Sequence, residues 1–579
     1  MDHQLVRRHV DKTVRRMFDI LERKRDTFTQ IAREFIPSAV PGFTKDETEL
    51  AEGYNIDEAH PYYTTIPQTQ LNKGAAGFHT NLTSPARPWF RLRAKAFGDL
   101  SIHEGASAVN AAMDAATEAV EWLMASTNCY SQCHKFYRHW LAFGTAAMLV
   151  LPDKDKIART VTLRPGTYAL DVGADGKVNR LARKFSWTVE QLVERFGRKN
   201  IPESILKRTD RQIRYPVINL IEPNGSNEDR AWDRISKTIG LDGKYEFRSI
   251  YFFKDPALSP ETQGLIKPVK GFLYNPIVAC RYEYEHGDVW GYSVGQMCLP
   301  TAKGLNSYKY DLQKVSGDTA EPAVVASSSL KDEGLQLGRR GVNWTAPGEQ
   351  RENLVVPVFT GERNMTLTKE EAMEARQELA DAFYVSTFAT IDALKLNPGV
   401  KTATEIEQLV RENLEMLGAH VANLNEEFLD PLVTAYFRLA QNAGIARTGK
   451  DEALGGININ SVEIEYVSAV HLAQKAAKLK NSQMWLAFVA DSAQADPSLG
   501  QLPNWEVAAR EIGRMMGVPE RMVKSDREFE QIRKSLQAQA EEQAQTMKLA
   551  QTGQIAKDIA AMPIDMNHAG GRLAEALGG

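Results

Sequence analysis

The sequence Leu394-Lys-Leu-Asn-Pro-Gly-Val-Lys401 separates two helical patterns within residues 365–443. The residues before it, from 367 to 392, contain no Gly or Pro and predict one continuous helix. After it, Thr402-Ala-Thr-Glu405 is a capping box, in which the threonine hydroxyl and the glutamate carboxylate each bind an amide at the helix start. A second helix should run from there to Asp430, where Pro431 is expected to kink or end it.

The second helix is long for a globular protein. Its apolar residues recur at close to a heptad spacing: Ile406, Val410, Leu414, Leu417, Val421, Leu424 and Phe428. At 1.5 Å per residue, the predicted helix is about 43 Å long. Two long helices in succession predict a helical pillar around which the rest of the chain is organised.

The length, composition and net charge are those of a soluble globular protein. The chain has 579 residues, 43% of them hydrophobic and 25% charged, with a net charge of −4. No run of about 18 apolar residues predicts a membrane span, and the N-terminus leads into a charged helix instead of an apolar signal core. Four cysteines fit a reducing compartment, so we expect a protein made in the cytoplasm.

The pattern along the chain predicts an α+β fold that is mainly helical. Helices are expected at 4–36, 65–84, 106–127, 136–147, 293–316 (restarting at Pro300), 471–490, 505–516 and 526–549. Between residues 161 and 284 the period changes to that of strands, and Asp175-Gly176 predicts a hairpin in a mainly antiparallel sheet. Short β-prone pieces occur within the Gly- and Ser-rich residues 317–363, and residues 457–466 predict one more strand.

No motif supports catalysis or a cofactor. The sequences Gly173-Ala-Asp-Gly-Lys177 and Gly240-Leu-Asp-Gly-Lys244 lack the spacing of a phosphate loop, and both are interpreted as turns between strands. Cys129 and Cys133 share a helix face, but His134 and His139 point elsewhere, so a buried structural pair is favoured over a metal site. The acidic clusters are interpreted as solvated. Asp153 and Asp155 are assigned to a turn, and Glu370-Glu371 and Glu426-Glu427 to exposed helix faces.

Several short segments, taken in order, resemble the portal (head-to-tail connecting) proteins of short-tailed, podovirus-type bacteriophages. They are Leu21-Glu-Arg-Lys-Arg, Phe35-Ile-Pro, Gly74-Ala-Ala-Gly-Phe-His-Thr-Asn-Leu-Thr-Ser-Pro, Trp89-Phe-Arg-Leu, Phe143-Gly-Thr-Ala-Ala-Met-Leu-Val-Leu, Tyr292-Ser-Val-Gly, Leu299-Pro-Thr-Ala-Lys-Gly-Leu-Asn306, Val467-Ser-Ala-Val-His-Leu-Ala-Gln and Gly517-Val-Pro-Glu-Arg-Met-Val-Lys-Ser. Each is weak alone, but their order over about 500 residues makes the resemblance specific.

The resemblance implies a ring, usually of twelve subunits, at one vertex of a virion capsid, through which double-stranded DNA enters and leaves. The implied partners are the terminase large subunit that drives packaging, the major capsid or scaffolding protein, and a tail adaptor protein, with no membrane. The implied domains are a wing (1–290), a first stem helix (291–316), a clip (317–363), a second stem helix (364–392), a tunnel loop (393–401), a long wing helix and strand (402–466), and crown helices with a mobile tail (467–579).

The resemblance places the tunnel loop at the narrowest part of the channel. Lys395, Asn397 and Lys401 are therefore the predicted DNA-contacting residues, with the two lysines touching phosphates transiently. The alternative is that the lysines are solvent-facing helix-end residues. Two other functions stay open from sequence alone: another virion ring such as a head-tail adaptor, or a nucleic-acid enzyme subunit, against which the missing phosphate loop argues.

Overall fold

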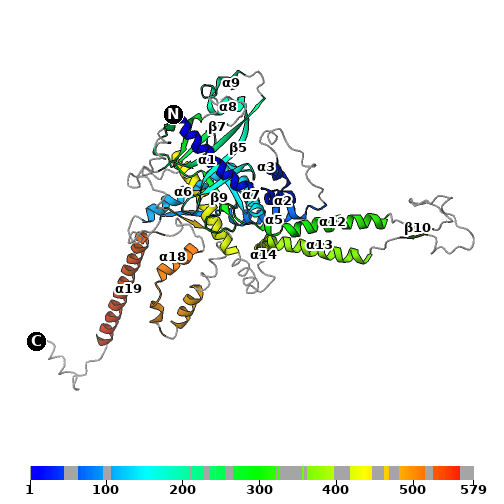
Figure 1. Ribbon diagram of the computed structural model, residues 1–579. Helices are drawn as coiled ribbons and strands as arrows, with labels where there is room; N and C mark the ends of the chain where they lie inside the picture. Colours follow the sequence, from blue (N-terminus) through cyan, green and yellow to red (C-terminus); the bar gives the residue numbers. More distant parts are fainter. Residues whose placement is uncertain are drawn as a thin grey trace, which may run out of the picture.

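The computed structural model gives the arrangement of most of the chain. It describes residues 2–44, 63–94, 106–207, 212–225, 235, 238–241, 243–253, 265–320, 324–326, 355–357, 362–396, 417–445, 462–467, 482–493, 496, 498–515, 524 and 526–560. Figure 1 shows a central body, a pair of helices that projects from one side of it, and a long helix that extends from another.

The main hydrophobic core lies between helices and a small sheet. Helices α2 (Arg25–Phe35), α5 (Ile66–Leu82), α6 (Ala106–Ser126), α7 (Cys129–Phe143) and α16 (Asp430–Asn442) all contribute buried residues to it. The sheet has the order β3-β2-β9, where β2 (Thr145–Asp153) pairs antiparallel with β3 (Ile157–Thr162) and with β9 (Ile277–Arg281). A 3-10 turn (Pro37–Ala39) and α3 (Val40–Thr44) follow α2.

A second sheet of five antiparallel strands confirms the predicted β region. Its order is β4-β5-β6-β7-β8, built from β4 (Tyr168–Val172), β5 (Val178–Thr188), β6 (Arg214–Pro223), β7 (Phe247–Phe253) and β8 (Leu265–Phe272). The hairpin at Asp175-Gly176 is present, and Gly176 adopts a φ of 74° that favours glycine. Gly240 also has a positive φ, but it follows helical residues 238–239, so its interpretation as a turn between two strands is wrong.

Alternate residues of the five-stranded sheet bury its two faces against different helices. Ile218 and Leu220 of β6 pack with apolar residues of α1 (Asp2–Glu22), whereas Tyr215 and Val217 pack with α8 (Val189–Phe196). This period of two is what a strand imposes on its side chains. The capping box of Thr188 starts α8, and a 3-10 turn (Arg198–Asn200) and α9 (Glu203–Leu206) follow it.

Two of the N-terminal helices differ from the prediction in their bounds. The helix expected over 4–36 is two helices, because the chain turns at Arg23-Lys24 so that α1 lies on the five-stranded sheet and α2 enters the main core. The helix expected over 136–147 is α7, which begins at Cys129 and ends at Phe143, because Gly144 adopts a left-handed conformation. Thr145 is therefore already in β2.

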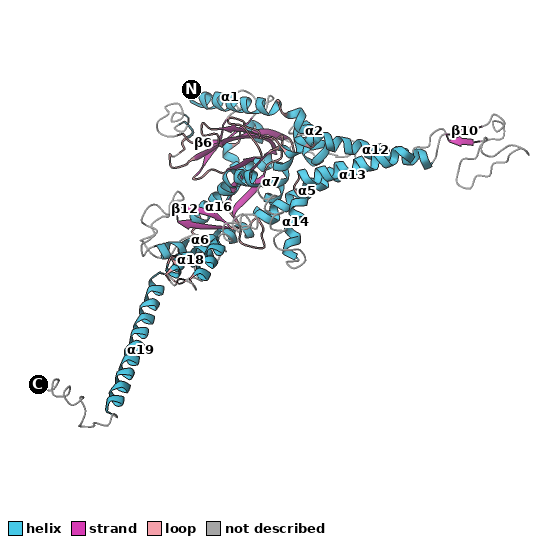
Figure 2. Ribbon diagram, turned by 90° about the horizontal axis from the view of Figure 1, so that it is seen from below, coloured by secondary structure: helices cyan, strands magenta, loops and turns pink. Residues whose placement is uncertain are grey.

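The projecting pair consists of α12 (Leu299–Ala320) and α13 (Glu362–Ala382), which lie side by side (Figures 1 and 2). The short helix α11 (Val294–Met297) precedes α12, so the predicted restart near Pro300 is confirmed. Two short strands, β10 (Val324–Ala326) and β11 (Val355–Pro357), pair antiparallel at the far end of the projection. They match the β-prone pieces seen in the sequence.

The helix predicted over residues 367–392 is not continuous. It divides into α13, which ends at Ala382, and α14 (Val385–Leu396). Between them Tyr384 has a φ of 60°, a left-handed conformation that is unusual for a residue with a side chain. No Gly or Pro causes this break, so its cause must lie in tertiary contacts.

The long helix after the loop is helical from residue 417, and the start predicted at Thr402 lies outside the described residues. Pro431 does not end this helix. A π-helical turn (Asn425–Leu429) leads directly into α16, in which Pro431 occupies the first turn. The π-helical turn, in which the Asp430 amide donates to the Asn425 carbonyl oxygen, lies directly before the proline and is where the helix accommodates its missing amide.

A small sheet precedes the C-terminal helices along the chain. In it, β12 (Val462–Tyr466) pairs antiparallel with β1 (Phe90–Ala94). Residues 482–492 are helical, and a 3-10 turn (Leu499–Gln501) and α18 (Trp505–Met515) come next. The last helix, α19 (Asp526–Ala560), is longer than the predicted 526–549. None of the described helices combines the length and apolar character that a membrane crossing needs.

Candidate functional site

The predicted loop residues fall at the end of α14. Lys395 lies in the last turn of this helix, whereas Asn397 and Lys401 lie outside the described residues. A cation at this position also interacts favourably with the negative end of the helix dipole, which is the physical basis of the alternative interpretation of Lys395. The position of Lys395 depends on how α14 is fixed to the body.

The bend between α13 and α14 is packed tightly against α5. The backbone carbonyl of Phe383 lies against Gly74, so close that a Cβ there would stand 2.4 Å from the oxygen. The ring of Phe388 covers Gly77 in the same way, at 2.2 Å from such a Cβ. Phe78, in the next position of α5, packs edge-on against both Tyr384 and Phe388. These two close contacts explain why glycine is needed at positions 74 and 77 of α5.

Tyr384 is also held by a hydrogen bond between hydroxyls. Its Oη lies 2.6 Å from the Oη of Tyr282, which follows β9. Burial raises the pKa of Tyr384, so both hydroxyls stay protonated at neutral pH. A left-handed tyrosine costs about 1–3 kcal/mol, and such strain persists only when the surrounding contacts determine it. The hydroxyl pair and the contacts with α5 are those contacts.

Tyr282 also contacts the helix on the other side of the loop. Its ring stacks on that of His420, with centroids 4.1 Å apart and an interplanar angle of 20°. Asn423 donates an amide hydrogen bond to the Tyr282 carbonyl oxygen at 3.3 Å. Burial lowers the pKa of His420, so the ring is neutral at pH 7 and stacks without a charge. Tyr282 thus joins the bend at Tyr384 to helical residues 417–424, and the Tyr384 ring also meets the His420 ring, at 6.4 Å between centroids.

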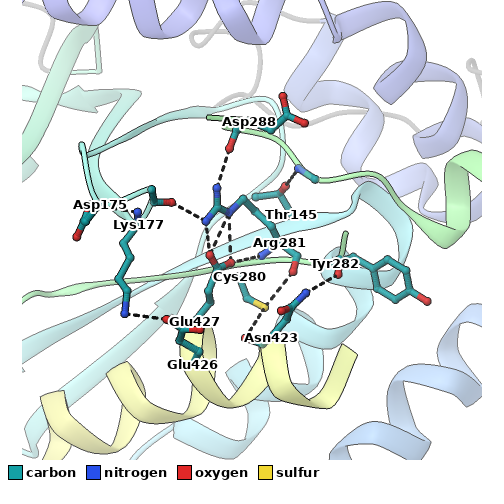
Figure 3. A network of polar contacts seen from close by, with 12 residues as sticks. Thr145, Asp175, Lys177, Cys280, Arg281, Tyr282, Asp288, Asn423, Glu426 and Glu427 are labelled. Atoms are coloured by element: carbon teal, nitrogen blue, oxygen red, sulfur yellow. Dashed lines mark hydrogen bonds and ion pairs between the residues drawn. The ribbon is translucent and has the colours of Figure 1, made fainter. Parts of the chain in front are cut away.

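A buried ion pair lies next to Tyr282 in the sequence (Figure 3). Arg281 pairs with Glu427, a residue of the π-helical turn; its backbone amide donates to Oε2 at 2.8 Å and its Nε to Oε1 at 3.1 Å. The guanidinium also donates to the carbonyl oxygens of Gly176, at 2.8 Å, and Asp288, at 2.7 Å. One side chain therefore joins β9, the β4–β5 hairpin, the following loop and the long helix.

The prediction that Glu426-Glu427 is a solvated helix face is half wrong. Glu426 pairs with Lys177 at 2.9 Å, and each of these side chains is 60% exposed. Glu427, in contrast, is 7% exposed and its partner Arg281 is 1% exposed. Adjacent helix residues point in different directions, so one faces solvent and the other faces β9. Of the other sites predicted to be solvated, Asp155 and Glu370 are exposed, whereas Asp153 and Glu371 are partly buried.

The cysteine pair is buried, as predicted. The Sγ atoms of Cys129 and Cys133 are buried and 3.9 Å apart. Burial lowers the pKa of His139 to about 3, and His134 contacts the ring of His79 at the surface of α7 instead of approaching the thiols. Within the part of the chain that the structure describes, no group of three or more metal-ligating side chains comes together.

Comparison with known proteins identifies the family. The family of bacteriophage head to tail connecting proteins matches residues 11–523. The chain belongs to this family. Two relatives extend the match: a probable portal protein of Bordetella phage BPP-1 is 26% identical over 475 residues, which is 81% of each chain. The portal protein of Salmonella phage epsilon15 is 25% identical over 481 residues, 82% of each chain.

Both relatives confirm the resemblance to phage portal proteins that the sequence segments indicated. Among solved structures, a chain from the virion of a native gene transfer agent particle covers 78% of this chain and 97% of its own, with 14% identity and a TM-score of 0.30. A TM-score this low allows no comparison of individual elements.

Four residues of the site carry no sequence signal of their own. Tyr282, Tyr384, His420 and Glu427 each stand in an ordinary helical or strand pattern. The one signal that could have located the bend is the pair Gly74 and Gly77, since two glycines three residues apart on a helix predict the close approach of another backbone.

Proposed function

We infer that the chain is a portal protein: a ring-forming subunit of the virion that connects head and tail and conducts double-stranded DNA. The observation that carries this is the family match over residues 11–523, together with two portal proteins that each align over about four fifths of the chain. The relatives are named for a structural role, and we propose that this chain has no catalytic activity. The docking of packaging motor and tail belongs to the same proposal.

The helix pair that projects from the body supports an assignment of the domains. We propose that α12 and α13 are the two stem helices and that residues 317–363, which include β10 and β11 at its far end, form the clip. The wing would comprise residues 1–290 and the long helix after 402, and the crown would comprise residues 467–579. The terminase large subunit and the tail adaptor would contact the clip, and the capsid or scaffolding protein would contact the wing.

Ring formation is the direct test of this function. Identical subunits with heterologous contacts close into a ring when the rotation between neighbours divides a full turn. Twelve chains of 64.6 kDa would give a particle of about 775 kDa by native mass spectrometry or light scattering. A chain that remains a monomer at every protein and salt concentration would contradict the proposal.

Lys395, Asn397 and Lys401 remain our proposal for contacts with DNA. A conduit must let DNA slide, so a few transient phosphate contacts suit it better than a strongly basic surface. The support from the fold is that α14 carries Lys395 at its far end while its first turn is fixed to α5.

Replacing Lys395 and Lys401 together with alanine is expected to reduce DNA packaging or retention severalfold while ring assembly continues. The matched control replaces two lysines in the turn between β2 and β3, Lys154 and Lys156, which are exposed. In an in vitro packaging assay, normal DNA content in the Lys395→Ala, Lys401→Ala particles would remove these residues from the site.

A further inference from the structure

Nothing in the local sequence breaks the helix between α13 and α14. Residues 362–396 contain neither Gly nor Pro, and a tyrosine resists the φ of 60° that it adopts at position 384. The local preference is therefore one continuous helix, and the bend exists because contacts outside this segment oppose that preference. A segment whose local and tertiary preferences disagree has two competing conformations.

The opposing contacts come from two places. On one side, α5 receives the Phe383 carbonyl at Gly74 and the Phe388 ring at Gly77. On the other side, Tyr282 holds the Tyr384 hydroxyl at 2.6 Å. One exposed hydrogen bond also bridges the bend, from Ser386 to Asp381, but water can replace it readily.

Tyr282 makes the bend dependent on the helix that follows the loop. Its ring stacks on His420 and its carbonyl accepts from Asn423, so a shift of residues 417–424 changes the position of its hydroxyl. The preceding residue, Arg281, is fixed by Glu427 of the same helix. The Tyr384 ring also meets the His420 ring directly, with centroids 6.4 Å apart. A displacement of α14 or of residues 417–424 is therefore transmitted to the other through Tyr282 and through this ring contact.

We propose that Phe383-Tyr384 is a two-state hinge and that Tyr282 and Tyr384 are positioning residues that select its bent state. In the other state, α13 and α14 form one helix, Phe388 leaves Gly77, and Lys395 moves with the end of α14. One part of this proposal rests on the proposed portal function, namely that the hinge sets where Lys395 meets DNA. The existence of the hinge does not depend on that function.

The test compares Tyr384→Phe with Tyr282→Phe in the full-length protein. Each variant removes the same hydrogen bond while keeping the ring, so folding is preserved. Spin labels at two exposed positions, Lys73→Cys on α5 and Ala389→Cys on α14, report the bend as a short distance and the continuous helix as a long one. The four native cysteines are buried, so the introduced ones react selectively. Labelled chains are diluted with unlabelled ones to exclude distances between subunits.

Each single variant is expected to raise the ratio of long to short distances about fivefold, as the loss of one net hydrogen bond does. The double variant should match either single one, because both remove the same interaction. Tyr310→Phe on α12 is the matched control and should leave the ratio unchanged. A ratio unchanged in both Tyr384→Phe and Tyr282→Phe, or effects that add in the double variant, would overturn the proposal.

A packaging assay on the same variants separates the hinge from the portal function. If the distances shift and DNA retention changes with them, the hinge positions the DNA contact. If the distances shift while retention stays normal, the hinge is real but its link to DNA is wrong. If wild-type rings fail to package at all, the proposed function fails and the distance result still stands.

Discussion

Replacing Glu427 with alanine is expected to lower the free energy of unfolding by about 3–5 kcal/mol, because it leaves a buried guanidinium without its counter-charge. Arg281 is 1% exposed and cannot reach solvent without moving the hairpin turn at Gly176, whose carbonyl oxygen it binds. Arg281 keeps its contact with the Tyr284 ring and its hydrogen bonds to two carbonyl oxygens, but none of these groups carries a full negative charge. The loss should appear as a lower urea midpoint, followed by tryptophan fluorescence.

The adjacent glutamate provides the matched control. Glu426→Ala removes the same group from the same helix, but from an ion pair in which both side chains are 60% exposed. Exposed pairs contribute about 0–1 kcal/mol, so its urea midpoint should stay close to that of the unmodified protein. Similar, small losses in both variants would show that Arg281 finds water or another partner when Glu427 is removed, contrary to its burial.

What the sequence predicts well is what local chemistry decides. The restart of α12 beside Pro300 and the hairpin at Asp175-Gly176 are both set by residues within a few positions of each other. The buried faces of the strands are predictable for the same reason, since alternation is a property of the strand itself.

The bend at Tyr384 and the burial of Glu427 could not be predicted in this way. The helical pattern of residues 367–392 is uninterrupted, and the contacts that hold the break come from α5 and from Tyr282, both far away in the sequence. Glu427 stands beside Glu426 in an acidic pair that is typical of a solvated face, and only the approach of β9 distinguishes them. In both cases tertiary contact overrides a correct local signal.

The approach of α5 to the bend depends on the absence of side chains at two positions. At Gly77 a new methyl group would meet the ring of Phe388, which can rotate in part. At Gly74 it would meet the backbone oxygen of Phe383 at 2.4 Å, and a backbone can move only if α5 and the bend separate as units. The Gly74 contact is therefore the stricter of the two.

Gly74→Ala is accordingly expected to destabilise the protein by about 1–3 kcal/mol, the usual result of overpacking a buried contact. This opposes the gain of about 1 kcal/mol that alanine brings over glycine within a helix. Gly317→Ala in α12 isolates that gain, because a Cβ at Gly317 meets nothing within 4 Å. Thermal unfolding should thus move in opposite directions, with the midpoint lower for Gly74→Ala and unchanged or higher for Gly317→Ala. A midpoint that rises equally in both variants would mean that α5 does not hold the bend, and the left-handed Tyr384 would then need another cause.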